Sequence, residues 1–519
     1  MTASTMTRRG PSSRGRLATV EVMCPKGTTP EGWGRGIPAT VLHPMDSAAP
    51  TPPLEVTREA WLALAVATSA AFLVVIDVSV VNVALPSIAD DFAATTTELS
   101  WVVSGYNIAL ASLLLLAGRL ADRRGRRKTF MTGVIGFLIG SMLCGLAPNA
   151  EALIAARVIQ AVGGALLTPA SLAMVLPQFP LAKRGVAIGV WGAMGALGAA
   201  FGPSVGALLV EASGWRLIFL INVPIGAMVV FAATRLVPES RDERATGPLD
   251  LIGVPIGVVG VALAMWGIVR SESAGWTSPS VLGLIGVGLV LLPIVVWRSA
   301  RHPAPLLDLS LFRARSFSVA VAAFWFYSLA FTAGFLLNSF MLQRLWGMSV
   351  LQTGFALTPG PIVGAVSSAP LGGLADRIGH RWVVASGAVL CSGSYLWIRL
   401  LAGEEQEFLR VFLPASLVLG LGVGATIAGL QSAAMSEIAP HQFASANATI
   451  RTTQQVGYAI GISVVLTLAA QLDLAGFQAG YSWVVGAFFL AAVVFATWYP
   501  SGSAASRTAG AAATGQVKT

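Results

Sequence analysis

The sequence is short of charge and of cysteine, and it lacks the loop that binds nucleotide phosphates. Only 11% of its 519 residues are charged, against about 25% in an ordinary soluble domain, so most of the chain cannot face water. Its three cysteines, Cys24, Cys144 and Cys391, have no spacing typical of a disulfide framework or a metal site. A glycine-rich loop ending in Lys-Ser or Lys-Thr is absent, which excludes a Walker-type site and the direct use of ATP.

Hydrophobic residues make up 55% of the chain, and they gather in runs of about twenty, enough helix to cross a hydrocarbon core about 30 Å thick. Residues 281–296 are apolar on every side, unlike the alternating strands of a membrane barrel. We therefore predict an all-α integral membrane protein with about fourteen transmembrane helices. The predicted spans are 61–84, 101–121, 129–147, 152–176, 187–209, 215–236, 249–269, 281–299, 318–342, 353–375, 382–401, 411–435, 452–471 and 481–498.

Basic residues favour one side of the predicted membrane. Cytoplasmic loops carry an excess of Lys and Arg, and the loops on the side of the N-terminus hold most of them, including Arg123, Arg124 and Lys128. We expect both termini in the cytoplasm of a bacterial cell, and we attribute the net charge of +9 to this inner surface and not to nucleic-acid binding. Residues 1–57 and 501–519 lack long apolar runs and are expected to be disordered tails.

Two loops carry nearly the same ten residues. GRLADRRGRR begins at Gly118 and GGLADRIGHR begins at Gly372, with seven identical positions. Each copy follows a predicted span at its cytoplasmic end, so we infer a duplicated six-helix unit. The predicted architecture is a six-helix bundle over 58–240, two inserted helices over 241–300, and a second six-helix bundle over 301–500.

The repeated loop resembles the signature that follows the second helix in the major facilitator superfamily. Within that superfamily, four more segments are similar to the fourteen-helix drug/proton antiporter branch: IDVSVVNVALP from Ile76, RVIQAVGGA from Arg157, GAAFGPSVGA from Gly198 and GWRLIFLINVPIG from Gly214. The resemblance covers nearly everything from about Trp61 onward. It implies two six-helix pseudo-repeats and a proton-coupled exporter of hydrophobic or cationic drug-like compounds, with the proton gradient as energy source and no cofactor.

Asp77 is the carboxylate that the predicted spans place at membrane depth, where an ionisable group is costly without a task or a partner. Such a buried carboxyl suits proton binding and release. Arg157 falls at a similar depth in the fourth span and can meet Asp77 directly or through water, with Gln160 one turn further on. The resemblance likewise assigns proton coupling to this acid and proton transfer to this arginine. The alternatives are an acid that only aligns helices and an arginine that holds backbone carbonyls or lipid phosphate.

The repeated loop combines turn-forming glycine with a carboxylate flanked by guanidinium groups. We predict a breakable charge network there, which closes one end of the protein in one state and releases it in another. The alternative is that the basic residues only set the membrane topology. The predicted gating residues are Gly118, Asp122, Arg123, Gly125, Arg126 and Arg127 in the first copy, with Asp376 and Arg377 in the second.

Glycines recur every three or four residues in the fifth predicted span. Small residues at this spacing let a neighbouring helix approach closely, and a proline among them bends the span. The pattern resembles the antiporter motif of the family, and generic tight packing is the alternative. The residues concerned are Gly198, Gly202, Pro203 and Gly206.

Aromatic and amide side chains within the spans are candidates for the lining of a substrate cavity. They are Asn82, Trp101, Tyr106, Asn107, Trp325, Tyr327, Asn338, Gln431 and Gln455. The four histidines lie in tails or inner loops, so we expect no histidine relay through the membrane, and no metal-ligand cluster is apparent. An enzyme is not expected, because no nucleophile, base and orienting group converge.

The expected partners are a small organic substrate, protons and the lipid bilayer, with no nucleic acid; other export partners are left open. Two alternatives to a multidrug exporter also stay open. One is an exporter devoted to a single metabolite such as an antibiotic, a siderophore or an amino acid. The other is a membrane sensor or scaffold that uses a transporter fold without transport.

Overall fold

The computed structural model describes residues 56–241, 250–302, 305–468 and 474–500, which form helices and turns and no strand. The predicted tails lie outside the described residues, except for residues 56 and 57. The helices are α1 (Arg58–Phe92), α2 (Thr96–Arg124), α3 (Arg126–Gly145), α4 (Ala150–Val175), α5 (Arg184–Ser213), α6 (Leu217–Leu220), α7 (Asn222–Leu236), α8 (Gly253–Ala274), α9 (Pro279–Ser299), α10 (Arg315–Phe340), α11 (Val350–Leu357), α12 (Pro359–Ile378), α13 (His380–Leu401), α14 (Leu413–Met435), α15 (Phe443–Leu468) and α16 (Leu474–Trp498).

Short polar side chains begin several of these helices. The Thr57 hydroxyl accepts a hydrogen bond from the backbone N–H of Ala60, at the first turn of α1. Thr95 and Glu98 form a reciprocal capping box at the start of α2, and Asn149 caps α4. Such caps satisfy backbone N–H groups that have no partner inside the helix.

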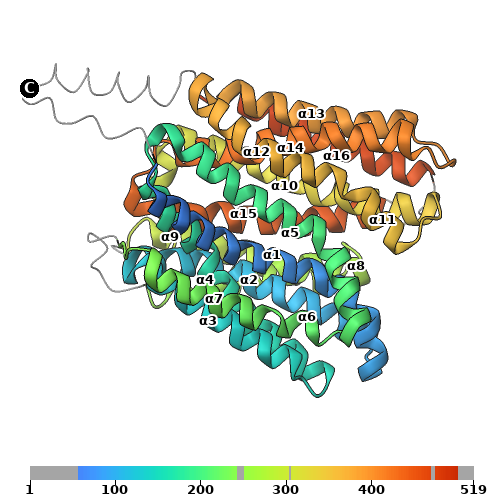
Figure 1. Ribbon diagram of the computed structural model, residues 1–519, viewed down its shortest axis with the longest axis horizontal. Helices are drawn as coiled ribbons and strands as arrows, with labels where there is room; N and C mark the ends of the chain where they lie inside the picture. The colour runs from blue at the N-terminus through green and yellow to red at the C-terminus, as the bar shows by residue number, and fades with distance from the viewer. Residues whose placement is uncertain (1–55, 242–249, 303–304, 469–473, 501–519) are drawn as a thin grey trace, which may run out of the picture. The chain divides into compact units, whose positions relative to one another are not determined.

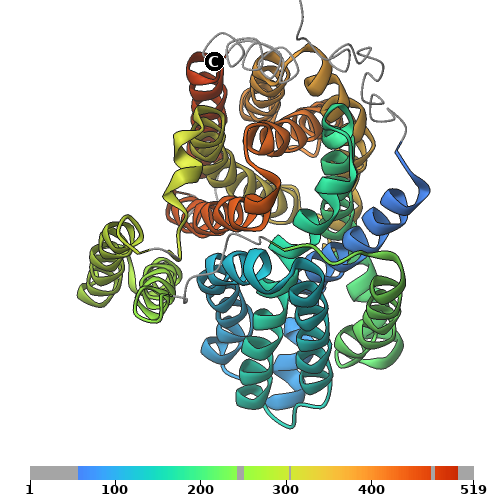
Figure 2. The same cartoon turned by 90° about the vertical axis from the view of Figure 1, so that its left-hand side faces the viewer.

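The helices pack as two groups and a hairpin (Figure 1). In the N-terminal group, α1 packs on α5, α4 packs on α2 and α3, and α7 packs on α3. In the C-terminal group, α14 packs on α12 and α13, and α16 packs on α10 and α13. The two groups meet along α5 with α12 and along α2 with α15, and Figure 2 shows them side by side in a view along the helices.

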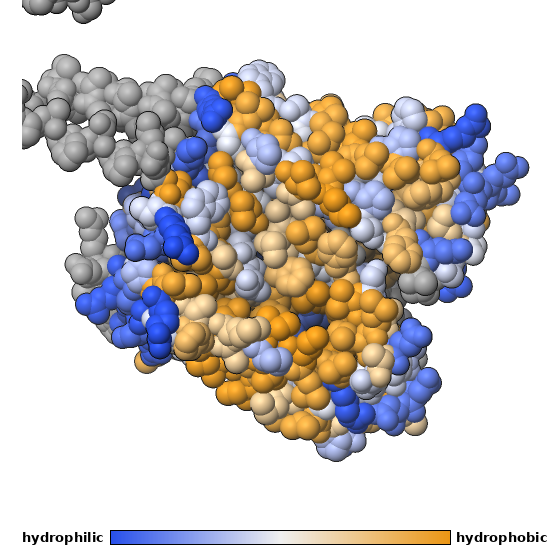
Figure 3. Space-filling view, in the orientation of Figure 1, coloured by the Kyte–Doolittle hydropathy of each residue, from blue (hydrophilic) through white to orange (hydrophobic). Residues whose placement is uncertain are grey.

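Eleven of the described helices are long and apolar enough to cross a membrane, or twelve if α5, which has a 44° bend, counts as one span. Helix occupies every predicted span, but α12 and α15 fall short of this apolarity. Both lie where the two groups meet, and α15 carries buried Asn447 and Gln454. The count of fourteen spans therefore stays a prediction. On the face shown in Figure 3, hydrophobic side chains cover a central band and hydrophilic ones gather at both ends.

The inserted helices α8 and α9 form a hairpin, and α8 touches one helix of each group, α2 and α15. Its base is fixed by Asp250, whose carboxylate accepts from Arg298 Nε at 2.6 Å and from the backbone N–H of Gly253 at 2.7 Å. Burial raises the pKa of the Asp250 carboxyl, but the hydrogen bonds from Gly253 and Arg298 outweigh it, so the pKa lies below its ordinary value.

Candidate functional site

One ion pair lies in the interior of the N-terminal group. The Arg157 Nη1 of α4 donates to Asp77 Oδ2 of α1 at 2.6 Å, and each side chain is 1% exposed. The structure thus brings together directly the acid and the base that the sequence places at one depth. Removing two charges from water costs several kcal/mol per ion, and the close contact and further hydrogen bonds of the pair offset this cost.

Amide and hydroxyl groups complete the surroundings of Asp77. Its Oδ1 accepts from Gln160 Nε2 at 2.8 Å and from Asn222 Nδ2 of α7 at 3.1 Å. The same two amides donate to the hydroxyl of Ser141 on α3, at 2.8 and 2.9 Å. Four helices, α1, α3, α4 and α7, therefore contribute to one buried polar cluster.

Aromatic rings also contact Arg157. Its guanidinium carbon lies 4.0 Å from the ring centroid of Tyr106 and 5.7 Å from that of Phe219, and its Nε donates to the carbonyl of Val102 at 3.3 Å. Such cation–π contacts stabilise a desolvated guanidinium by about 2 kcal/mol. Tyr106, a predicted cavity residue, is thus fully buried in the ion-pair site.

The hydrogen bonds around Asp77 match those of an ionised carboxylate. Every donor around Asp77 is satisfied by an ionised carboxylate, and a proton on Oδ2 must displace Arg157. Protonation would leave Arg157 as a buried charge without its counterion, which costs about 3–5 kcal/mol. The Asp77–Arg157 bond therefore holds α1 against α4.

The glycine-rich face of α5 packs on the part of α1 that holds Asp77. A Cβ added at Gly198 would lie 3.3 Å from the backbone nitrogen of Ile76, and one at Gly206 would lie 3.0 Å from a side-chain carbon of Val80. Gly202 makes a still closer approach to this stretch of α1, and the bend of α5 lies just before Pro203. The three glycines of the predicted antiporter motif therefore let α5 pack closely on the helix of the ion pair, and Pro203 lies at the bend between them.

Asp122, near the end of α2, binds the first turn of α15 in the other group. Its carboxylate accepts from the backbone N–H of Ala444 at 3.3 Å and of Ser445 at 2.8 Å, and from the Ser445 hydroxyl at 2.7 Å. Arg126 donates to Asp122 at 2.9 Å and also to the carbonyl of Pro440. The free N–H groups at a helix start attract negative charge, so this network joins the two groups.

Asp376, its counterpart in the second copy, makes the reciprocal contact. It accepts from the backbone N–H of Gly185, in the first turn of α5, at 2.6 Å, and from the Ser432 hydroxyl at 2.7 Å. His380 replaces Arg126 in the repeat, and its Nε2 lies 3.2 Å from Asp376 Oδ1. His380 is buried at the start of α13, so its predicted placement in a loop is wrong.

The repeat glycines serve close approach and sharp turning. A Cβ at Gly118 would lie 2.7 Å from the carbonyl oxygen of Ala444, and one at Gly372 would lie 2.5 Å from that of Gly185. Gly125 and Gly379 follow α2 and α12 with φ angles of 112° and 101°, a conformation that favours glycine. The glycines thus let the two groups touch at the end that bears the repeated loops.

The other basic residues of the loops differ in their contacts. Arg127 donates to the carbonyl of Val237 at 3.0 Å, which ties α3 to the end of α7. Arg123 is half-buried, and one of its terminal nitrogens has no hydrogen-bond partner within the described ranges. Arg377 is exposed. Of the charged residues predicted to form the gate, Asp122, Arg126 and Asp376 make side-chain hydrogen bonds between the two groups.

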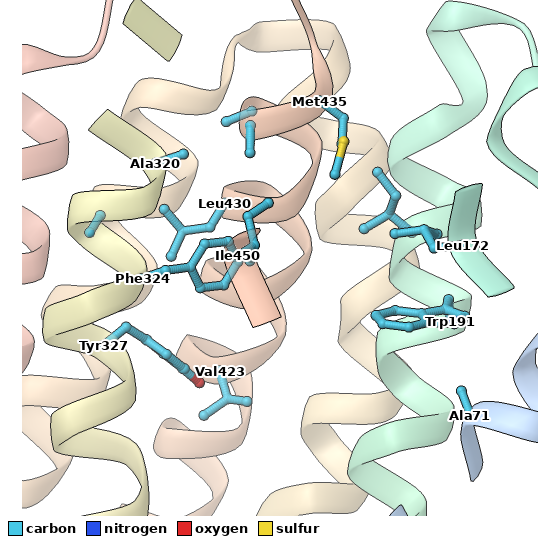
Figure 4. Close-up of a cluster of buried hydrophobic side chains, with 14 of the residues drawn as sticks. Ala71, Leu172, Trp191, Ala320, Phe324, Tyr327, Val423, Leu430, Met435 and Ile450 are labelled. Carbon is cyan, nitrogen blue, oxygen red and sulfur yellow. The ribbon is translucent and has the colours of Figure 1, made fainter. Parts of the chain in front are cut away.

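Several candidate cavity residues instead belong to packed interiors. Tyr327 is fully buried and stacks on Phe331 with ring centroids 5.6 Å apart, and Figure 4 shows it near Phe324 in the C-terminal group. Asn338 accepts from the Tyr481 hydroxyl at 3.0 Å in the same group. Tyr327 and Asn338 thus have their partners within one bundle, and the prediction that they line a cavity stays a prediction.

The remaining candidates range from exposed to buried. Asn82 is exposed and donates to a carbonyl of its own helix, and the Trp101 ring packs edge-on against Trp266 of α8 at 5.7 Å. Gln431 donates to Asn447 of α15 at 3.2 Å. The residues that stay half-buried are Asn107, Trp325 and Gln455.

Sequence reasoning missed four polar residues that complete the two networks. Ser141 and Asn222 belong to the ion-pair cluster, and Ser445 and His380 belong to the junction. Asn222 lies in the segment GWRLIFLINVPIG, which carries the family resemblance. This resemblance was the only feature of the sequence that pointed to it. His380 occupies the position of Arg126 in the repeated loop, and that repeat was its signal. Ser141 and Ser445 are short side chains, and nothing in a single sequence shows which way they point.

Two groups of apolar helices that meet along a junction, with a buried ion pair in one group, are typical of the class of secondary transporters. The comparison with protein families agrees with this class. The model of the Major Facilitator Superfamily matches residues 67–462 and again 316–517. The chain therefore belongs to the Major Facilitator Superfamily.

Its relatives include named resistance and export proteins. The multidrug resistance protein Stp of Mycobacterium tuberculosis is 33% identical over 77% of this chain and 74% of its own length. The puromycin resistance protein pur8 of Streptomyces alboniger is 33% identical over 82% and 84%. The probable actinorhodin transporter of Streptomyces coelicolor is 30% identical over 83% and 76%.

A solved structure shares the fold. The crystal structure of the human organic anion transporter MFSD10 matches with a TM-score of 0.62, over 84% of this chain and 99% of that one. At 18% sequence identity, this likeness concerns the fold alone.

Proposed function

We propose that the protein is a proton-driven exporter of drug-like organic compounds, an antiporter that works by alternating access. The observation that carries the proposal is the Asp77–Arg157 pair, fully buried inside a helical bundle of a family of transporters. The relatives named for multidrug and antibiotic resistance support the export of such compounds. The expected setting is a bacterial cytoplasmic membrane with both termini inside, and no cofactor is required.

In this mechanism a proton and a substrate alternate. A proton that reaches Asp77 breaks its bond with Arg157, and the cost of the unpaired guanidinium favours a second arrangement of α1 and α4. The contact of α5 with α1 transmits this movement to the junction with α12. The Asp122 and Asp376 contacts then separate, and the other end of the protein closes.

The proton gradient supplies enough energy for this exchange. One elementary charge that moves through 100 mV releases about 2.3 kcal/mol. One proton per cycle would therefore sustain a substrate gradient of roughly fifty-fold, since about 1.4 kcal/mol corresponds to a factor of ten.

The test is pH-driven transport in proteoliposomes. Asp77→Asn keeps the shape of the side chain and removes its exchangeable proton, so we expect it to abolish export driven by a pH gradient. Asp91→Asn is the matched control, because Asp91 is a half-exposed acid that pairs with Arg216 at the far end of α1. Full pH-driven export by Asp77→Asn would show that the proposed proton site is wrong.

A dedicated exporter is the second candidate, since two relatives are named for single compounds, puromycin and actinorhodin. A competition assay between compounds distinguishes a multidrug exporter from a dedicated one. Unrelated dyes that inhibit the export of one another indicate a multidrug exporter, whereas strict dependence on one compound indicates a dedicated one. Vesicles that move neither protons nor any compound of a broad panel would instead favour the sensor or scaffold.

A further inference from the structure

An arginine of α15 lies at the junction of the two groups without an acid partner. Arg451 is half-buried, and among the described residues its charge forms no ion pair. Its Nη1 donates to the amide oxygen of Gln454 at 3.0 Å, and its buried Nε has no partner within the described ranges. Arg157 and Arg126, by contrast, each bind a carboxylate.

An aromatic ring from the other group covers this guanidinium. The guanidinium carbon of Arg451 lies 4.4 Å from the ring centroid of Trp191 on α5. The indole N–H of Trp191 donates to the Ser171 hydroxyl of α4 at 3.2 Å, which fixes the plane of the ring. Figure 4 shows this ring projecting from α5. A ring face offsets part of the cost of a buried cation but supplies no counterion.

Arg451 and Trp191 lie where contact between the groups gives way to open space. Nearer the repeated loops, the Arg184 guanidinium of α5 lies 5.2 Å from the ring of Phe443, and Asn447 reaches the carbonyl of Pro169 on α4. One turn beyond Trp191, a Cβ added at Gly195 would meet nothing within 4 Å. The cation and the ring therefore lie about one helical turn from unfilled space beside α5.

The same face of α15 continues with groups suited to an organic ligand. Gln454, Gln455 and Tyr458 follow Arg451 at steps of three, four and seven residues, which a helix places on one side. Tyr458 lies within 6.4 Å of the ring of Phe331 on α10. Amides and aromatic rings around one cation form a surface that is apolar with a few directed polar groups.

We propose that Arg451 and Trp191 bind the carboxylate and the adjoining ring of the transported compound, so that the protein prefers aromatic acids. This inference rests on the proposed export function and names its substrate class. The free Nε and the remaining terminal nitrogen offer the forked donor pattern that matches a carboxylate. The preference differs from the hydrophobic or cationic compound that the family resemblance implies.

Two dyes that differ only in a carboxylate test this proposal in proteoliposomes with a pH gradient. Rhodamine 110 carries a free carboxylate, and rhodamine 123 is its methyl ester. We expect the wild-type protein to export the acid faster, and Arg451→Gln to slow the acid about tenfold with little change for the ester. Arg451→Lys, which keeps the charge, should retain part of the preference. Arg399→Gln is the matched control, because Arg399 is a half-buried arginine of α13 bonded to Ser482.

The outcomes separate this proposal from the function on which it rests. Equal loss of both dyes in Arg451→Gln, or no preference in the wild type, would mean that Arg451 only holds the junction together, which overturns the proposal. Export of neither dye would contradict the export function for this class of compound. In that case, binding of the acid to purified protein, measured by dye fluorescence, still decides the role of Arg451. Equal binding to the wild type and to Arg451→Gln overturns it.

Discussion

The hydroxyl of Ser79 on α1 donates to the backbone carbonyl of Ala199 on α5 at 3.3 Å. Pro203 has no N–H, so the carbonyl four residues before it has no helical partner. Ser79 thus restores from a neighbouring helix the hydrogen bond that α5 loses at its bend. Because Asp77 is two residues away on α1, the bend and the ion pair share one stretch of helix.

We predict that Ser79→Ala lowers stability by about 1 kcal/mol, because the Ala199 carbonyl then remains buried without a donor. Thermal unfolding of the purified protein measures the loss. Ser79→Thr is the control, since it keeps the hydroxyl. In a Pro203→Ala background the carbonyl regains its helical partner, so Ser79→Ala should cost much less there. Costs that simply add in the double variant would argue against the link.

The junction contacts predict the behaviour of Asp122→Asn and Asp376→Asn. Each variant replaces a charged acceptor at a helix start with an amide, which weakens the closed junction by about 1–3 kcal/mol. Each should raise the population in which this end is open. Spin-label distances between exposed positions 128 and 377, one in each group, report that population. The double variant should shift it by the sum of the two free energies, and unchanged distances in both single variants would exclude a gating role.

The hairpin base predicts a pH dependence with a definite sign. The lowered pKa of Asp250 means that its ionised form is favoured by folding, so its stabilisation is present above its ordinary value and is lost as the pH falls through the lowered one. Asp250→Asn should reduce stability by about 2 kcal/mol at neutral pH. The melting temperatures of variant and wild type should converge on acidification; a gap that widens in acid would contradict this account.

The sequence was sufficient to predict those features of the site that follow from helix geometry. A rise of 1.5 Å per residue fixes depth in the membrane, so the meeting of Asp77 with Arg157 could be predicted before any coordinates. The repeated loop located Asp122 and Asp376 for the same kind of reason, since a duplication places equivalent residues at equivalent helix ends. Their partners on α15 and α5 were not predictable, because they come from the other half of the chain.

The sequence did not determine which neighbouring helix each side chain of a span faces. A span that is apolar on all sides has no polar face to show which way it points, so Tyr327 and Asn338 were assigned to a cavity and lie inside a bundle. Ser141 and Asn222 escaped notice for the same reason. Arg451 escaped notice because its helix is among the less apolar ones, and its isolation is apparent only once its neighbours are in place.

Asp122 binds the start of α15 and Asp376 binds the start of α5. These two contacts together affect how often this end of the protein opens spontaneously. Opening this end must break both contacts in one movement, so their probabilities multiply. If each contributes about 2 kcal/mol, one alone would permit spontaneous opening roughly once in thirty trials, and the two together roughly once in a thousand. Duplication of a ten-residue loop has thus given the protein two contacts that close the same end. Leakage of substrate back through this end requires both contacts to break at once.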